Sequence, residues 1–162
     1  MRYLPNSDSC FVCGRINPSG LRVRFQVDQG EVRTIFTASA EQCSYHGVAH
    51  GGVLSALLDE TMGWAAAFEK RIFCYAAELR VRFLQHAPPG KPLTVVGRMT
   101  TDRGRIWETE GEIRGEDGVI YARGWGKYIP MSEEQTLEVM KYLVFDDETV
   151  SREDLLPPSS SE

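Results

Sequence analysis

The stretch that decides the fold is HGGVLSALLDETMGWAAAF, residues 50–68, near the middle of the chain. After its glycine pair it holds no proline and few β-branched residues, so it predicts one α-helix of about five turns from Gly51 to Phe68. Apolar side chains occur nearly all round that helix, a pattern that indicates a buried helix rather than a surface one. We therefore expect a long central helix against which the rest of the chain packs.

Strands are expected on both sides of this helix. Apolar and polar residues alternate over residues 21–27, and Asp28-Gln29-Gly30 is a turn into a second strand at 31–37. Four further strands follow the helix, at 78–84, 93–101, 105–114 and 119–129. Consecutive hairpins make the sheet mainly antiparallel. The expected fold class is α+β, with an antiparallel sheet wrapped around one long central helix.

The chain divides into a folded body and less regular ends. The body is expected at residues 21–130, and the glycine- and proline-rich lead-in before it contains a CxxC pair, Cys10 and Cys13. The full division is an irregular lead-in at 1–20, the sheet-and-helix domain at 21–130, a short C-terminal helix at 131–145, and an acidic, disordered tail at 146–162.

Charge and cysteine usage exclude several classes of function. Of the net charge of −5, residues 133–162 contribute nine acidic and two basic side chains, while the rest of the chain is slightly basic, so nucleic acid is not the expected partner. No apolar run is long enough to span a membrane and no signal peptide is evident, so we expect a cytoplasmic protein. A structural zinc site would need a second Cys or His pair, and none is present, so no metal is expected.

Two glycines open the helix. The first N–H groups of a helix have no partner inside it and lie at the positive end of its dipole. Without Cβ atoms, Gly51 and Gly52 would let a carbonyl oxygen approach the backbone, as an oxyanion site requires. Close packing of the helix start on a strand explains a glycine pair more often, so this feature alone does not decide the function.

Asp59 is the most informative residue of the helix. A carboxylate in a nearly apolar helix is costly unless it is solvated, paired or protonated, so Asp59 is either a structural hydrogen-bonding group or, in a cleft, a base or nucleophile. It lies about 12 Å along the axis from Gly51 and cannot easily attack a carbonyl held at its own helix start. A two-fold partner with an antiparallel helix would supply that start, so we expect a homodimer. Glu60 points about 100° away from Asp59, so at most one of the two acids faces the core side and the other faces the rim or a partner.

These residues resemble a known signature. His50-Gly51-Gly52, the apolar run and Asp59 resemble the HGG motif of hotdog-fold thioesterases, particularly the phenylacetyl-CoA thioesterase-like clade. The opening CFVCG of residues 10–14 and the strand at 78–84 are similar to segments of many bacterial members. The resemblance spans roughly residues 10–130, and the spacing from HGG to Asp59 is its most specific part.

The resemblance implies a fold, a substrate and a mechanism. It implies a hotdog fold and a homodimer that often pairs into a tetramer. It also implies an acyl-CoA substrate, and because CoA is part of that substrate, no separate cofactor is needed. Asp59 would act as nucleophile or as general base on water, and the N–H of Gly51 or Gly52 from the other chain would polarise the thioester carbonyl. His50 would cap the helix or take a direct part in catalysis.

The sequence also departs from that family. Related enzymes often place an asparagine several residues before the HGG, where this chain offers only Ser44 and His46 as substitutes. Ser44, His46 and Glu60 are the candidate substrate-binding residues. Some members carry a hydroxyl residue where this chain has Ala76 and Ala77. Two alternatives therefore stay open: a non-hydrolytic acyl-CoA-binding protein, and a hydratase or dehydratase that uses a histidine beside the acid.

Overall fold

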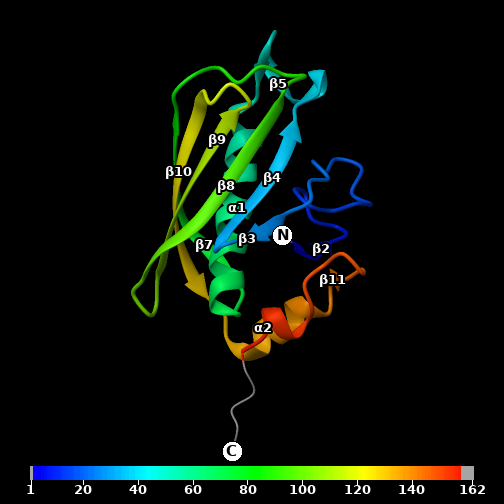
Figure 1. Ribbon diagram of the computed structural model, residues 1–162, viewed down its shortest axis with the longest axis vertical. Helices are drawn as coiled ribbons and strands as arrows, with labels where there is room; N and C mark the ends of the chain where they lie inside the picture. The colour runs from blue at the N-terminus through cyan, green and yellow to red at the C-terminus, as the bar shows by residue number, and fades with distance from the viewer. Residues whose placement is uncertain (1, 158–162) are drawn as a thin grey trace, which may run out of the picture.

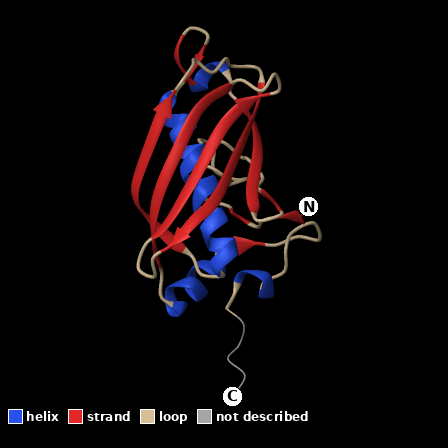
Figure 2. Cartoon of the chain, turned by 60° about the vertical axis from the view of Figure 1, so that its left-hand side comes forward, coloured by secondary structure: helices blue, strands red, loops and turns tan. Residues whose placement is uncertain are grey.

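One long helix lies across the concave face of a curved sheet. The computed structural model describes residues 2–157, and its central helix α1 spans Gly51–Lys70. The views in Figures 1 and 2 show the strands curving around this helix. The predicted α+β fold, an antiparallel sheet around one central helix, is thereby confirmed. The helix ends where Arg71 adopts a left-handed conformation with φ of 55°, which terminates the intrahelical hydrogen bonding.

The main sheet has seven strands, and every neighbouring pair is antiparallel. Their spatial order is β1-β3-β4-β8-β9-β10-β7. The strands are β1 (Arg2–Tyr3), β3 (Gln26–Asp28), β4 (Glu31–Thr37), β7 (Cys74–Phe83), β8 (Pro92–Asp102), β9 (Trp107–Gly115) and β10 (Ile120–Pro130).

The expectation of consecutive hairpins after the helix holds only from β8 to β10. Strand β7 pairs with β10 at the far edge, so its connection to β8 crosses the end of the sheet. Pro88 and Pro89 lie in that connection and offer no N–H to a ladder, which disfavours a tight hairpin there. Strand β7 consequently has a free edge.

The core lies between α1 and the sheet. Leu57, Leu58 and Met62 are fully buried there. The sheet approaches the helix closely at Gly97, where a Cβ atom would lie 3.0 Å from the backbone of Thr61 and Met62. Within residues 2–157, no helix is both long and apolar enough to cross a membrane.

The first predicted strand is shorter than expected. Only Gln26–Asp28 pairs with β4, although the alternation at 21–27 correctly marks Val23 and Phe25 as buried. Arg22 has a positive φ of 57°, which interrupts the extended backbone. The N–H of Val23 then bonds to the carbonyl oxygen of Val12 at 3.1 Å, so this segment pairs with the lead-in.

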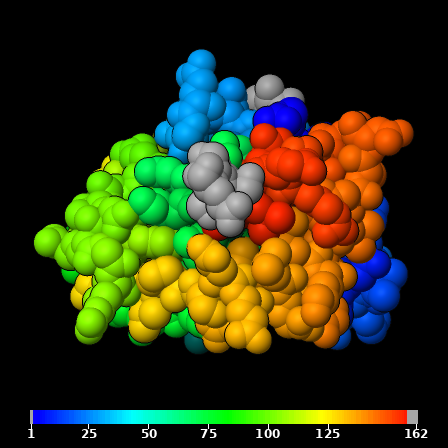
Figure 3. All heavy atoms as spheres, turned by 90° about the horizontal axis from the view of Figure 1, so that it is seen from below, coloured from blue at the N-terminus to red at the C-terminus, as the bar shows by residue number. Residues whose placement is uncertain are grey.

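The C-terminal part differs from the expected disordered tail. Helix α2 (Glu133–Met140) lies within the expected segment 131–145, and β11 (Leu143–Val144) pairs with β2 (Asn6–Ser7) of the lead-in. Beyond them, Val150 and Leu155 are each only 1% exposed. Figure 3 shows these orange and red segments covering the lower end of the molecule. These two buried side chains, together with the ion pair of Arg2 with Asp154, hold the acidic segment against the body. Residues 158–162 of the expected tail lie outside the described range.

Candidate functional site

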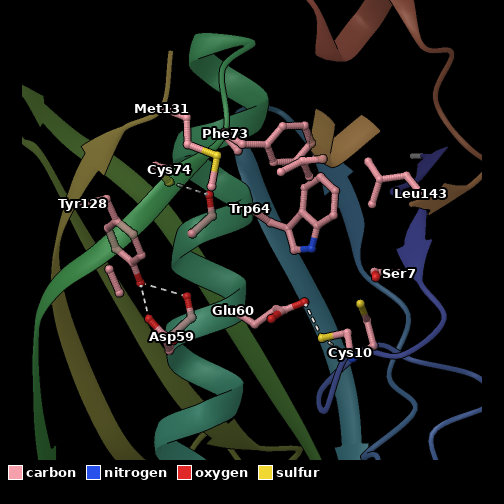
Figure 4. Close-up of a pocket in the computed structure, with 15 residues that line it drawn as sticks. Ser7, Cys10, Asp59, Glu60, Trp64, Phe73, Cys74, Tyr128, Met131 and Leu143 are labelled. Atoms are coloured by element: carbon pink, nitrogen blue, oxygen red, sulfur yellow. Dashed lines mark hydrogen bonds between the residues drawn. The ribbon is translucent and has the colours of Figure 1, made fainter. Parts of the chain in front are cut away.

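Asp59 is held by a tyrosine of the sheet strand that faces the helix. It lies in the middle of α1, half-buried, and the hydroxyl of Tyr128 on β10 donates to its Oδ1 at 2.9 Å (Figure 4). The same hydroxyl lies 2.8 Å from the main-chain oxygen of Asp59. Among the hydrogen bonds of residues 2–157, none involves Oδ2 of Asp59. The carboxylate is therefore anchored through Oδ1, whereas Oδ2 has no hydrogen-bond partner among the described residues.

A strand irregularity lies opposite this tyrosine. The pairing of β10 with β7 shifts between Lys127 and Tyr128, so that Tyr128 faces Ala76 and Ala77 is the unpaired extra residue. Bulges of this kind bend a strand and occur often beside functional sites. Ala76 and Ala77, where some members of the resembled family carry a hydroxyl residue, thus lie at a bulge opposite Tyr128.

The surroundings make Asp59 a weaker acid and thus a stronger base. Burial raises its pKa, and the hydrogen bond from Tyr128 partly offsets that rise by favouring the charged form. Burial, and then the charge of Asp59, keep the pKa of Tyr128 well above its usual range, so the phenol remains a donor. The same two causes raise the pKa of the Cys74 thiol to about 12, which leaves it protonated and poorly nucleophilic.

Asp59 opens into an apolar cavity of about 260 Å³. The cavity lies between the second half of α1, the start of β7 and the N- and C-terminal segments (Figure 4). Its walls are mainly hydrophobic, with a few polar groups, which is the usual composition of a small-molecule site. The residues around it include Ser7, Cys10, Asp59, Glu60, Trp64, Phe73, Cys74, Tyr128, Met131 and Leu143.

Glu60 faces away from Asp59, toward the lead-in. The Sγ of Cys10 is hydrogen-bonded to its Oε1 at 3.3 Å (Figure 4). Burial, together with the charge of Cys10, raises the pKa of Glu60 to about 8. The 100° rotation between consecutive helical residues therefore directs the two acids to different partners, Tyr128 for Asp59 and the CxxC pair for Glu60.

The start of α1 has one free donor. His50 is the N-cap, and its Nδ1 accepts the N–H of Gly52 at 2.8 Å. The N–H of Gly51 has no hydrogen-bond partner in the part of the chain that the structure describes. Of the two predicted oxyanion donors, Gly51 is thus the available one in the isolated chain, and His50 is engaged as a cap.

The structure does not gather all predicted site residues within one chain. Ser44 and His46 belong to the short hairpin of β5 (Cys43–Tyr45) and β6 (Val48–Ala49), and line a separate hollow beside the 88–90 loop. The cavity of Asp59 and Glu60 is lined by neither of them, and neither Gly51 nor Gly52 lines it.

Sequence reasoning missed Tyr128, which is 69 residues away from Asp59. Its contact depends on the register of β10 against α1, for which a linear sequence carries no signal.

Comparison with known proteins gives a family and several structural neighbours. Residues 46–122 match the family model described as the thioesterase superfamily. A solved thioesterase superfamily protein is 30% identical, with a TM-score of 0.70; the alignment covers 74% of this chain and 62% of that protein, less than two thirds of its length. No curated protein matches the sequence.

Two further solved structures share the fold at lower identity. The E. coli PaaI protein from the phenylacetic acid degradation operon is 21% identical with a TM-score of 0.64, covering 69% of this chain and 81% of that one. A Streptococcus mutans protein bound to acetyl CoA is 17% identical with a TM-score of 0.62, and the alignment covers 67% of this chain and 89% of that one.

Proposed function

We propose that this chain is an enzyme of the thioesterase superfamily, whose model its residues 46–122 match, and that it hydrolyses an acyl-CoA thioester to the free acid and CoA. The observation that carries the proposal is the Asp59 carboxylate, anchored by Tyr128 through one oxygen and open to an apolar cavity. A carboxylate with a raised pKa and a free oxygen is suited to general-base or nucleophilic chemistry.

Both mechanisms use the same atoms. As a general base, Asp59 takes a proton from water while the water oxygen bonds to the thioester carbon; the C–S bond then breaks, and the leaving thiolate takes up the proton. As a nucleophile, an oxygen of Asp59 bonds to that carbon, expels the thiolate and leaves a mixed anhydride that water hydrolyses. In either case the N–H of Gly51 would stabilise negative charge on the carbonyl oxygen.

The complete site in this proposal needs two chains. Gly51 and Asp59 lie about 12 Å apart along one helix, so a single chain cannot present both to one carbonyl. Support for a dimer comes from α1, where Gly52, Ala56, Asp59 and Gly63 form a partly exposed stripe at helical spacing. An isologous pair with antiparallel stripes would bring each Asp59 to the partner's glycine end.

The free edge of β7 supports the same arrangement. It carries exposed Tyr75, Leu79 and Phe83, and the ring of Phe83 lies against Gly51. An exposed apolar edge strand invites pairing with another edge. We propose that two copies join along β7, and that such dimers can pair further into a tetramer.

The second candidate is a protein that binds acyl-CoA without hydrolysing it. The observation that favours it is the pair Ala76 and Ala77, which offers no hydroxyl at the bulge beside Asp59 to position water. In that case the cavity would hold the acyl group and Asp59 would serve as a structural partner of Tyr128.

Thiol release from a panel of aryl, short-chain and long-chain acyl-CoAs tests both candidates. Wild type is compared with Asp59→Asn and with Glu69→Gln, a control that changes an exposed acid of the same helix. Hydrolysis by wild type and the control but not by Asp59→Asn supports the thioesterase. Acyl-CoA that raises the melting temperature of all three proteins without any thiol release supports the binding protein.

A further inference from the structure

The CxxC segment of the lead-in forms a tight turn around one sulfur atom. The Sγ of Cys10 accepts the N–H groups of Val12 at 3.3 Å and Cys13 at 3.5 Å. The N–H of Gly14 closes the turn on the carbonyl oxygen of Cys10 at 3.0 Å. A Cβ atom on Gly14 would lie 2.3 Å from that oxygen, so only glycine fits. Two backbone donors directed at one sulfur stabilise a thiolate, the form that binds metals.

A third ligand group reaches this turn from α1. Glu60, which lies 50 residues after Cys10, bonds to its sulfur (Figure 4). The two sulfurs and a carboxylate oxygen of Glu60 all lie within 4.8 Å of one another. Ligands around a tetrahedral zinc ion are separated by about 3.5 Å to 4 Å, given bonds of ~2.3 Å to sulfur and ~2.0 Å to oxygen. The three groups therefore need only small side-chain shifts to share one ion.

The charge around this cluster favours a cation. Cys10, Cys13 and Glu60 are all groups that bind metal ions in their deprotonated forms, and Asp59 directly precedes Glu60 in the helix. Among the ion pairs of residues 2–157, none brings a lysine, arginine or histidine to Asp59 or Glu60. Ligand groups that lie this close together without a cationic side chain nearby suit a divalent ion, which would bind all three at once.

We propose that Cys10, Cys13 and Glu60 bind one zinc-class divalent metal ion, whose fourth coordination position opens to the cavity that also contains Asp59. Two thiolates and a carboxylate suit a borderline-soft ion such as Zn²⁺. Bound there, the ion ties the lead-in to the central helix directly beside the catalytic candidate. This proposal does not depend on the thioesterase activity, because it rests only on the ligand cluster.

Cobalt substitution of the full-length chain tests the site. The reduced, chelator-treated protein is titrated with Co²⁺, and the sulfur-to-cobalt charge-transfer band and the intense visible bands of tetrahedral Co²⁺ are recorded. We expect one Co²⁺ per chain, displaced by Zn²⁺, with a higher melting temperature in the metal-bound form. Cys13→Ser should abolish the charge-transfer band. Glu60→Gln should weaken binding by more than about tenfold, since even outer partners of metal ligands contribute that much.

A matched control is Cys43→Ser, which removes a thiol of β5 outside the cluster and should bind Co²⁺ like wild type. Circular dichroism verifies that each variant is folded; if Cys13→Ser is not, Glu60→Gln carries the test. Equal Co²⁺ binding by wild type and Glu60→Gln would overturn the proposal. So would a reduced wild type that binds no Co²⁺ and readily forms a Cys10–Cys13 disulfide, because the pair would then be a redox dithiol.

Discussion

Replacing Tyr128 by phenylalanine isolates the hydrogen bond that tunes Asp59. The change removes one oxygen from a side chain that is 2% exposed and keeps its ring in place. The lost contact is the 2.9 Å bond from the hydroxyl to Oδ1. A hydrogen bond to a charged group contributes about 1.5 to 3 kcal/mol, and the lower end applies because this hydroxyl is shared with a main-chain oxygen and the carboxylate is partly solvated.

About 1.5 kcal/mol corresponds to a tenfold change in the ratio of charged to protonated Asp59. Burial raises the pKa of Asp59 and the Tyr128 bond lowers it, so loss of the bond raises the pKa further. Since the proposed chemistry needs the carboxylate, the acid limb of kcat/KM should move to higher pH in Tyr128→Phe. On that limb the rate should fall about tenfold, while the plateau at higher pH stays nearly unchanged.

The assay is thiol release from the best acyl-CoA substrate as a function of pH, with Tyr121→Phe as the control. Tyr121 is a buried residue of the same strand whose hydroxyl makes no hydrogen bond to Asp59. The carboxyl-carbon NMR shift of Asp59 follows the same titration without depending on turnover. A Tyr128→Phe variant that loses activity equally at all pH values, with no movement of the acid limb, would refute the reasoning.

Three further predictions concern stability, measured by urea denaturation. Gly97→Ala should lower the free energy of unfolding by about 1–3 kcal/mol, because the new Cβ atom meets the helix backbone at 3.0 Å. Gly124→Ala should lower it less, because its Cβ atom meets the flexible ends of side chains. The reverse order would contradict this account. His50→Ala should lower the free energy of unfolding by about 1 kcal/mol because the helix loses its N-cap. His50→Ser should restore that stability, and a serine variant as unstable as the alanine variant would contradict the capping role. Leu155→Ala should lower the free energy of unfolding by about 2–5 kcal/mol, whereas the control Leu137→Ala, which changes an exposed leucine, should leave it almost unchanged. Equal losses of stability would argue against a docked C-terminal segment.

Local patterns in the sequence predicted the main elements well. The helix at 51–68 was recognisable because this long apolar stretch contains no proline and few β-branched residues, and the structure extends it only to Lys70. The strand at 31–37 and the three strands that become β8, β9 and β10 agree with the structure to within two residues at each end. These elements are determined by near neighbours in the chain.

Features that depend on distant contacts were not predictable from the same patterns. The pairing of β7 with β10 and the hydrogen bond from Tyr128 to Asp59 join residues far apart in the chain. The docking of Leu155 depends on a surface that other segments build. For the same reason, ligand spacing along the chain suggested no metal site, since Glu60 reaches the cysteines only after the lead-in has folded against α1.

The pairing of the lead-in with the C-terminal segment sets the order in which this chain can finish folding on the ribosome. Tyr3 bonds to Glu148 and Val150, and β2 pairs with β11. At about 5–20 residues per second, the lead-in waits roughly seven to thirty seconds for these partners to be synthesised. During that interval its backbone is open to proteases and chaperones. A chain that ends before Leu143 would lack one of the residues that line the cavity beside Asp59.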